Sequence, residues 1–265
     1  MRFKVKLEAI GGKRVLPINY QYPLSAAIYR IISKGSKEYA SFLHEKGYGK
    51  GFKFFCFSDI KTPFQLEGDR LLLQQDEVEV QVAFHLPEAM QHFVQGLFAS
   101  EKITIADKKS QQDFKVKTIE SVATGLSSYK ENEIISVVLR PQSPLVLGLK
   151  NEAWKYDYLD PEHPRYIEMF LYSWREKIKA SYGDELASSA LLLAEVVFYN
   201  HPSRSRLITV KSDTKEETKI RGYVKFKLEV KAERRFVELL LNAGGGLYNA
   251  LGMGFLEIVE EKLEV

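Results

Sequence analysis

The sequence predicts an α+β protein built of two tandem ferredoxin-like domains. The first observation behind this prediction is length, because 265 residues suit two domains and a domain typically has about 100–200 residues. The second is the order of expected elements in the first half, β-α-β-β-α-β, which is the ferredoxin-like pattern. The third is that this order recurs in the second half without a visible sequence repeat. We expect domains at residues 1–125 and 126–265, divided where Gly125 and the residues after it interrupt the pattern.

The first half opens on a half-buried strand, since polar and apolar side chains alternate over residues 2–9. An apolar helical pattern follows at Leu24–Ile32, and Ser36 is placed to cap a second helix that ends at Gly47. Proline is favoured in the first turn of a helix, which predicts a third helix over Pro87–Phe98. The other strands of this half are expected at Phe52–Phe57, Asp69–Gln74, Glu77–Phe84, Lys102–Ala106 and Phe114–Ala123.

The second half continues the alternation of strands and helices. Pro141 and Pro144 separate its first two strands, and Ala187–Phe198 fits either a buried helix or a strand. The remaining elements are expected as strands at Ile134–Leu139 and Leu145–Leu149, a helix at Pro164–Tyr182, hairpin arms at Arg206–Lys211 and Lys219–Lys231, a helix at Arg234–Asn242 and a strand at Phe255–Val259.

Composition excludes several classes of protein. Cys56 is the single cysteine, which excludes an internal disulfide framework and a cysteine-rich zinc site. The longest apolar runs, such as Ala190–Ala194, are far shorter than the ~20 residues of a membrane-spanning helix. No signal-peptide pattern opens the chain, so we expect a cytoplasmic protein. None of the five histidines has a partner at a metal-binding spacing, so we expect no metal and no other cofactor.

The net charge of +3 conceals two basic segments. Residues 1–53 carry +8 and residues 203–235 carry +6, so the rest of the chain is acidic at −11. Two basic blocks indicate a polyanionic partner that contacts two distant segments. The alternative is that these side chains lie on solvated strand faces, and charge alone does not exclude it.

A glycine-rich segment, Gly244–Gly254, lies between the last expected helix and strand and has five glycines in eleven residues. Glycines let the backbone approach a phosphate closely and direct successive N–H groups toward it. The segment is neither a Walker A loop nor a Rossmann turn, because no Gly-Lys-Ser/Thr follows and it leads into a strand. The alternative is a tight helix-to-strand connection that needs positive φ angles.

At this segment the sequence resembles the endoribonucleases of the CRISPR-associated RAMP superfamily, which cut precursor CRISPR RNA within each repeat. Their signature is two Gly-hydrophobic-Gly units before the last strand. Here Gly244-Gly245-Gly246 and Gly252-Met253-Gly254 match it, with a glycine replacing the usual apolar residue of the first unit. Ser143-Pro144-Leu145, the opening Met1-Arg2-Phe3 and Leu43-His44-Glu45 also look like this family. The resemblance covers the whole chain and implies RNA binding.

Archaeal members of the family use a Tyr/His/Lys triad, and the matching residues here are Tyr29, His44 and Lys50. A general base takes the proton of a ribose 2′-hydroxyl, whose oxygen attacks the adjacent phosphate. A general acid protonates the departing 5′-oxygen, and a cation stabilises the charged phosphorane. Histidine suits proton transfer near neutral pH, and tyrosine, with a pKa of about 10, is the better acid. We therefore assign His44 as base, Tyr29 as acid and Lys50 as stabiliser, while the reverse assignment of His44 and Tyr29 stays open.

Each of these residues also has a plain structural alternative. Tyr29 on an amphipathic helix can cover the edge of a core, His44 near a helix C-terminus can complement the helix dipole, and Lys50 can be a loop lysine.

With this resemblance, the two basic blocks are interpreted as RNA contacts along a cleft between the halves, which would make affinity sensitive to salt. The glycine-rich segment would add N–H donors to phosphates. The residues expected to contact RNA are Arg2, Lys4, Lys6, Arg204, Arg206, Arg221, Lys225, Lys227, Lys231, Gly244, Gly246, Gly252 and Gly254.

The resemblance implies a metal-independent endoribonuclease that cleaves CRISPR repeat RNA and leaves 2′,3′-cyclic phosphate and 5′-hydroxyl ends. Its expected partner is precursor CRISPR RNA, and other subunits of a CRISPR effector complex are further candidates; no membrane is expected. The alternative function is that of a non-catalytic RNA-binding RAMP subunit of such a complex, which would bind RNA without cutting it.

Overall fold

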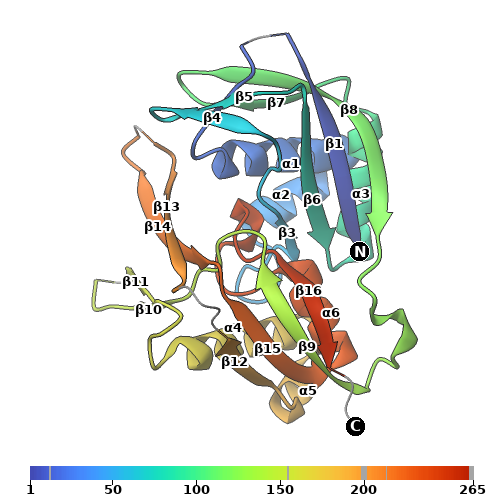
Figure 1. Cartoon of the computed structure of the whole chain (residues 1–265). Coiled ribbons are helices and arrows are strands. Elements are labelled where there is room, and N and C mark those ends of the chain that lie inside the picture. The colour runs from blue at the N-terminus through green and yellow to red at the C-terminus, as the bar shows by residue number, and fades with distance from the viewer. Residues whose placement is uncertain (12, 154, 198–201, 213, 263–265) are drawn as a thin grey trace.

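The computed structural model describes residues 1–11, 13–153, 155–197, 202–212 and 214–262. The chain folds into two halves, one above the other in Figure 1, and each half is a β-sheet with helices on one face. The face covered by helices is called the helix side below, and the uncovered face is called the sheet side.

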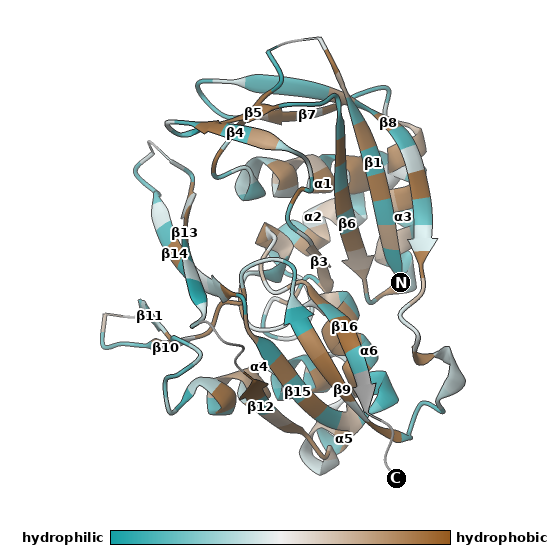
Figure 2. Cartoon of the chain, viewed as in Figure 1, coloured by the Kyte–Doolittle hydropathy of each residue, from teal (hydrophilic) through white to brown (hydrophobic). Residues whose placement is uncertain are grey.

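The first half is an antiparallel sheet whose strand order is β3-β6-β1-β8-β7. This is the ferredoxin-like order with β7 added at one edge. Val5 and Leu7 of the first strand are buried against the helices, and Figure 2 shows the alternation with polar residues as bands along that strand. The elements are β1 (Arg2–Ile10), α1 (Gln21–Gly35), α2 (Lys37–Glu45), β3 (Phe55–Phe57), β6 (Glu77–Phe84), α3 (Pro87–Phe98), β7 (Ile103–Ala106) and β8 (Gln111–Val122).

The second half repeats the arrangement with the strand order β12-β15-β9-β16. The predicted fold of two tandem ferredoxin-like domains is therefore confirmed. The ambiguous stretch from Ala187 contains the end of α5 and strand β12, while Phe198 lies outside the described residues. The elements are β9 (Ile134–Pro141), α4 (Tyr166–Tyr182), α5 (Asp184–Ser189), β12 (Leu193–Val197), β15 (Lys227–Glu233), α6 (Arg234–Ala243) and β16 (Leu256–Lys262).

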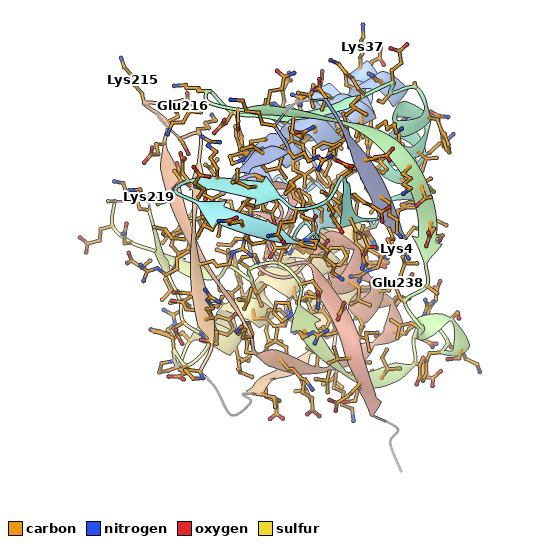
Figure 3. All side chains as sticks on the ribbon, turned by 45° about the horizontal axis from the view of Figure 1, so that its top comes forward. Lys4, Lys37, Lys215, Glu216, Lys219 and Glu238 are labelled. Atoms are coloured by element: carbon orange, nitrogen blue, oxygen red, sulfur yellow. The ribbon has the colours of Figure 1, made fainter. Side chains whose placement is uncertain are left out.

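Smaller elements are inserted into both halves. A hairpin of β13 and β14 leaves the second half and extends along the first, and Figure 3 shows Lys215 and Glu216 at its free end. These elements are the sheet of β2 (Val15–Pro17), β5 (Arg70–Leu73) and β4 (Phe64–Glu67), the pair β10 (Gly148–Lys150) and β11 (Tyr156–Tyr158), the hairpin β13 (Arg204–Val210) and β14 (Thr218–Val224), and the short helices η1 (Leu126–Ser128) and η2 (Asn249–Leu251).

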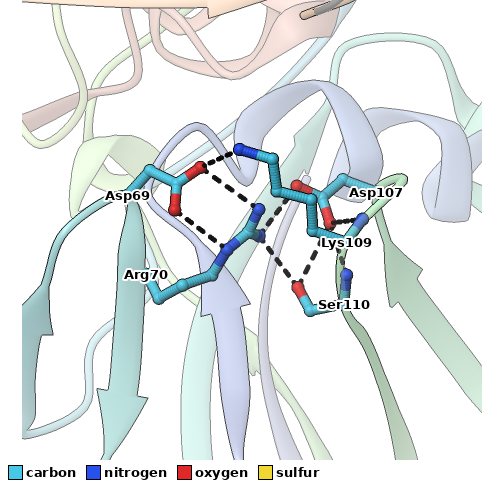
Figure 4. A network of polar contacts seen from close by, with 5 residues as sticks. All are labelled: Asp69, Arg70, Asp107, Lys109 and Ser110. Atoms are coloured by element: carbon cyan, nitrogen blue, oxygen red, sulfur yellow. Dashed lines mark hydrogen bonds and ion pairs between the residues drawn. The ribbon is translucent and has the colours of Figure 1, made fainter.

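A polar network joins the small sheet to the turn between β7 and β8 (Figure 4). Arg70 lies between Asp107, whose carboxylate is 2.7 Å from Nη1, and Ser110, whose hydroxyl accepts a hydrogen bond at 2.9 Å. Lys109 binds Asp69 at 2.8 Å on the outer side. The arginine side chain is mostly buried, so this network fixes the small sheet against the main one more firmly than exposed pairs do.

Two local predictions were wrong, and one was confirmed. The hairpin arm predicted over Lys219–Lys231 is not continuous, because the chain turns at Lys225, whose φ is +65°, and then joins a different sheet as β15. The strand predicted at Leu145–Leu149 is reduced to a single bridge to Tyr223 before β10 begins. The cap at Ser36 is confirmed, since its hydroxyl accepts a hydrogen bond from the Tyr39 N–H at 3.2 Å.

Candidate active site and RNA-binding surface

A pocket of about 680 Å³ opens between the two halves on the helix side. The first half contributes Tyr29 from α1, His44 from the last turn of α2, and Lys50 from the segment that follows. The second half contributes Lys177 of α4 and residues 246–251 of the glycine-rich segment. The fold thus brings the predicted Tyr, His and Lys together in one cavity.

Tyr29 and His44 lie side by side in the wall of this pocket. Their ring centroids are 5.7 Å apart with the rings edge to face, and Tyr29 also packs against the buried Phe55 at 5.5 Å. Burial raises the pKa of Tyr29 to about 12, so its hydroxyl is protonated at neutral pH and is able to donate. His44 is exposed at the end of its helix, where an incoming ligand can reach the imidazole.

Lys50 lies at the rim of the pocket with its side chain largely exposed. Its Nζ is 2.8 Å from Glu176 Oε2 and donates to the Tyr172 hydroxyl at 2.9 Å. The hydrogen bond to the Glu176 carboxylate raises the pKa of Lys50, so this side chain is charged at neutral pH. The lysine is therefore held by two side chains of α4, in the other half of the molecule.

Lys177 was missed by the sequence reasoning. Its side chain is fully buried, and Nζ donates to the carbonyls of Gly244 at 2.7 Å and Gly246 at 2.9 Å. Burial lowers the pKa of Lys177 to about 7. The signal for it was its position on the apolar face of the predicted helix, three residues after Trp174 and directly before Ile178. A lysine at such a position needs carbonyl or carboxylate partners in the interior.

Two further cations line the pocket and were not singled out by any motif. Lys53 donates from Nζ to the carbonyl of His44 at 3.2 Å, and burial lowers the pKa of Lys53. Arg30 donates to the Thr104 carbonyl at 2.7 Å. The signal in the sequence was the excess of positive charge in residues 1–53, which does not identify individual side chains.

The glycines of the glycine-rich segment are buried, and their backbone groups are bonded within the protein. The N–H groups of Gly244, Gly252 and Gly254 donate to the carbonyls of Leu240, Asn249 and Pro144. These three donors are therefore not free for phosphate, contrary to the prediction.

Space and conformation explain the glycines of this segment. Gly246 and Gly254 have φ angles of +65° and +69°. A Cβ would lie 2.2 Å from the Val146 carbonyl oxygen at Gly246, and 2.0 Å from the Gly245 carbonyl oxygen at Gly254. Glycine at these positions is thus required for folding of the loop. A direct contact of Gly246 with RNA stays a prediction.

Arg2 is buried, so the prediction that it contacts RNA is wrong. Its guanidinium donates to the carbonyls of Leu241, at 2.6 Å, and Leu256, and lies 4.4 Å from the centre of the Phe255 ring. The alternation of β1 places Arg2 on the polar face, but the second half covers this end of the strand. Arg2 therefore joins the two halves instead of facing solvent.

Lys4 and Lys6 of β1, and Lys227 and Lys231 of β15, lie on the sheet side. Their neighbours along each strand, such as Leu7, belong to the cores beneath the helices. Lys4 is 2.7 Å from Glu120. Lys6 and Lys227 are paired with Glu77 and Glu260. The expectation that these lysines share one cleft with the glycine-rich segment is wrong, because the sheets separate them from the pocket.

The hairpin and the turn that follows it at Lys225 carry the other basic residues that were predicted to contact RNA. Arg204, Arg221 and Lys225 are exposed. Arg206 instead forms an ion pair with Asp59, which also accepts a hydrogen bond from the Tyr20 hydroxyl at 3.0 Å. Arg206 thus links the hairpin to the first half, and the three exposed residues stay predicted RNA contacts.

Among the described residues, no group of three or more His, Cys, Asp or Glu side chains lies close enough together to hold a metal ion. Burial raises the pKa of Cys56 to about 12, so this thiol is protonated at neutral pH. In the same part of the chain no helix has the length and apolar character needed to cross a membrane.

Two ferredoxin-like halves and a C-terminal glycine-rich segment are the features expected from the resemblance to the RAMP superfamily. The sequence matches the family described as CRISPR-associated protein Cas6, N-terminal, over residues 15–120, and CRISPR associated protein Cas6, C-terminal, over residues 127–258. Together the two matches span most of the chain. The chain therefore belongs to the Cas6 family of CRISPR-associated proteins, as the resemblance predicted.

Solved structures share the fold over nearly the full length. One is from the characterization of a Cas6-related gene from Pyrococcus furiosus, with 19% identity, 99% of each chain covered and a TM-score of 0.78. Another is titled an RAMP protein binding different RNA substrates, with 18% identity, 98% and 100% coverage and a TM-score of 0.73. A third, the Cas6 (TTHB231) product complex, has 16% identity, 98% and 99% coverage and a TM-score of 0.61. No curated protein matches the sequence.

Proposed function

We propose that this protein is a metal-independent endoribonuclease that cleaves CRISPR repeat RNA in the pocket between its halves. One observation carries the proposal: three separate segments bring Tyr29, His44 and Lys50 into one cavity. Membership of the Cas6 family supports the substrate class, and a similar structure is described as a product complex.

In the proposed reaction, the His44 imidazole takes the proton of a ribose 2′-hydroxyl. The 2′-oxygen attacks the adjacent phosphorus, and the bond from phosphorus to the 5′-oxygen breaks. Tyr29 gives its proton to that departing oxygen, so the products are a 2′,3′-cyclic phosphate and a 5′-hydroxyl. The raised pKa of Tyr29 supports this assignment, because a protonated hydroxyl donates and does not act as a base.

Positive charge around the pocket supports the stabilisation of a phosphorane. Lys50 stands at the rim, and Lys53 and Arg30 line the same pocket. Cations in a partly desolvated site stabilise developing negative charge more than they would in water. We assign Lys50 to this role, and Lys53 as a second cation that also contacts the backbone of His44.

The test is incubation of the protein with repeat RNA from its host's CRISPR array, with and without EDTA. We expect the same cleavage rate in both, and upstream fragments whose 3′ ends resist phosphatase until acid opens the cyclic phosphate. Loss of cleavage in EDTA that added metal restores would overturn the metal-free mechanism. Free 3′-hydroxyl ends would exclude attack by the 2′-hydroxyl. Binding without any cleavage would support the non-catalytic alternative.

A further inference from the structure

A second cavity, of about 370 Å³, adjoins the catalytic pocket on the side of the second half. It lies among β10, β11, α4 and the glycine-rich segment. Lys50, Phe52 and Leu247 line both cavities, so a strand of RNA in the first is adjacent to the second. We call this cavity the side pocket. Its residues are Lys50, Phe52, Leu147, Gly148, Leu149, Lys150, Tyr156, Met169, Tyr172, Ser173, Glu176 and Leu247.

The walls of the side pocket suit a flat aromatic ligand. Phe52, Tyr156 and Tyr172 supply rings, and four further apolar side chains line the cavity, those of Leu147, Leu149, Met169 and Leu247. Tyr172 is 52% exposed and Lys150 Nζ lies 5.8 Å from the Tyr156 ring, so aromatic surface stands open beside positive charge. This combination is typical of sites that stack an unpaired nucleobase, since stacking on an aromatic ring contributes about 1–3 kcal/mol per base.

One carboxylate distinguishes the side pocket from a simple phosphate site. Glu176 is mostly buried, and its Oε2 holds Lys50 at 2.8 Å. A carboxylate repels phosphate but accepts hydrogen bonds from the edge of a base. Guanine presents two adjacent donors, N1–H and the N2 amino group, on its Watson–Crick edge, which fits the two oxygens of a carboxylate.

We propose that the side pocket binds one unpaired guanine next to the scissile phosphate, stacked on its aromatic walls and recognised by Glu176. This inference rests on the proposed function. It adds a consequence for catalysis: a base that engages Glu176 competes with Lys50 for the carboxylate. Lys50 is then released toward the phosphate in the adjoining pocket, so recognition of the base is coupled to stabilisation of the reaction.

The experiment measures single-turnover cleavage of repeat RNAs that carry each of the four bases at the two nucleotides flanking the scissile bond. We expect the wild-type protein to prefer guanine at one of these positions by about tenfold or more, the discrimination of a good two-point contact. Inosine, which lacks the N2 amino group, should lie between guanine and the other bases. Glu176→Gln should flatten the preference, because an amide offers only one acceptor. Glu168→Gln, on the exposed face of the same helix, should keep it.

The readout is a ratio of rates on two RNAs with one protein, so partial misfolding of a variant does not change it. Cleavage without a base preference at either position, or a preference that Glu176→Gln leaves intact, would overturn the assignment while the proposed nuclease function stands. Absence of cleavage on every RNA would count against the nuclease function itself and, with it, against this inference.

Discussion

The helix side and the sheet side of this protein carry different chemistry on the same scaffold. On the helix side, Tyr29 and His44 stand in a cavity that the second half closes. On the sheet side, Lys4 and Lys6 lie on open strands and are paired with carboxylates of neighbouring strands. The first side has groups that exchange protons, and the second has groups that only attract an anion. We therefore expect the helix side to control the rate of cleavage and the sheet side to contribute to RNA affinity.

This difference shows that basic residues close together in the sequence do not form a single surface in the folded protein. Arg2, Lys4 and Lys50 all belong to the first block, yet one is buried between the halves, one lies on a sheet and one stands at the pocket rim. The charge of a segment indicates a polyanionic partner, whereas the fold decides which charges can reach it.

The largest expected effect is that of His44→Ala, which tests the helix side directly. Loss of a positioned general base lowers the rate by about 100–10,000-fold, and we expect the single-turnover rate to fall within this range while RNA affinity changes little. His163→Ala, an exposed loop histidine in the second half, serves as the control and should cleave normally. An undiminished rate in His44→Ala would remove His44 from the site.

The next largest effect is expected in the glycine-rich segment, which lines the pocket on the helix side. Gly246→Ala forces a positive φ on alanine and places Cβ 2.2 Å from the Val146 carbonyl oxygen, so we expect a loss of about 3 kcal/mol in the free energy of unfolding. Gly68→Ala is the matched control, because φ is also positive there but no atom lies within 4 Å. It should cost about 1 kcal/mol. Equal losses in urea unfolding would show that packing does not constrain the loop.

Lys177→Met tests whether the buried Lys177, which binds carbonyls of the same loop, makes the free energy of unfolding depend on pH. The folded pKa of about 7 lies below the ordinary value of about 10.5, so between pH 7 and 8.5 the unfolded chain binds more protons than the folded one. Wild-type stability should therefore rise relative to the variant over this interval, by about 1–2 kcal/mol. Urea unfolding of both proteins at each pH measures the difference. A difference independent of pH would mean that Lys177 titrates as an ordinary lysine.

The smallest effect is expected on the sheet side. Lys4→Ala removes one charge that we predict contacts RNA, so affinity should fall a few-fold and the slope of log affinity against log salt should decrease by about 1. The cleavage rate at saturating protein should be unchanged. Lys37→Ala, at the start of α2 and far from Lys4 in Figure 3, is the control for an exposed lysine. A slower cleavage step in Lys4→Ala would contradict the assignment of the cleavage rate to the helix side alone.

Much of the fold could be predicted because its elements depend on local patterns in the sequence. The alternation of β1, the cap at Ser36 and the proline that begins α3 depend on neighbours within a few residues. The features that were mispredicted depend on tertiary contacts instead. The burial of Arg2 requires knowing that the second half covers one end of β1, and the break at Lys225 requires a positive φ in a residue other than glycine.

The residues of the candidate site also differ in how far the sequence could predict them. Tyr29, His44 and Lys50 were found by resemblance, since nothing in their spacing predicts that they meet. Lys177 was accessible to physical reasoning, because a lysine on an apolar helix face needs an interior partner. The role of the glycines was misjudged because the sequence shows where positive φ is allowed but not which carbonyls already accept their N–H groups.

In the proposed reaction, the pocket between the halves directs a ribose 2′-hydroxyl against the adjacent phosphate. The most direct measurement uses repeat RNA with a single 2′-deoxy nucleotide at the scissile position, compared with unmodified RNA under single-turnover conditions. We predict that the modified RNA binds with nearly the same affinity and is not cut at that bond. Continued cleavage at the deoxy position would contradict the account.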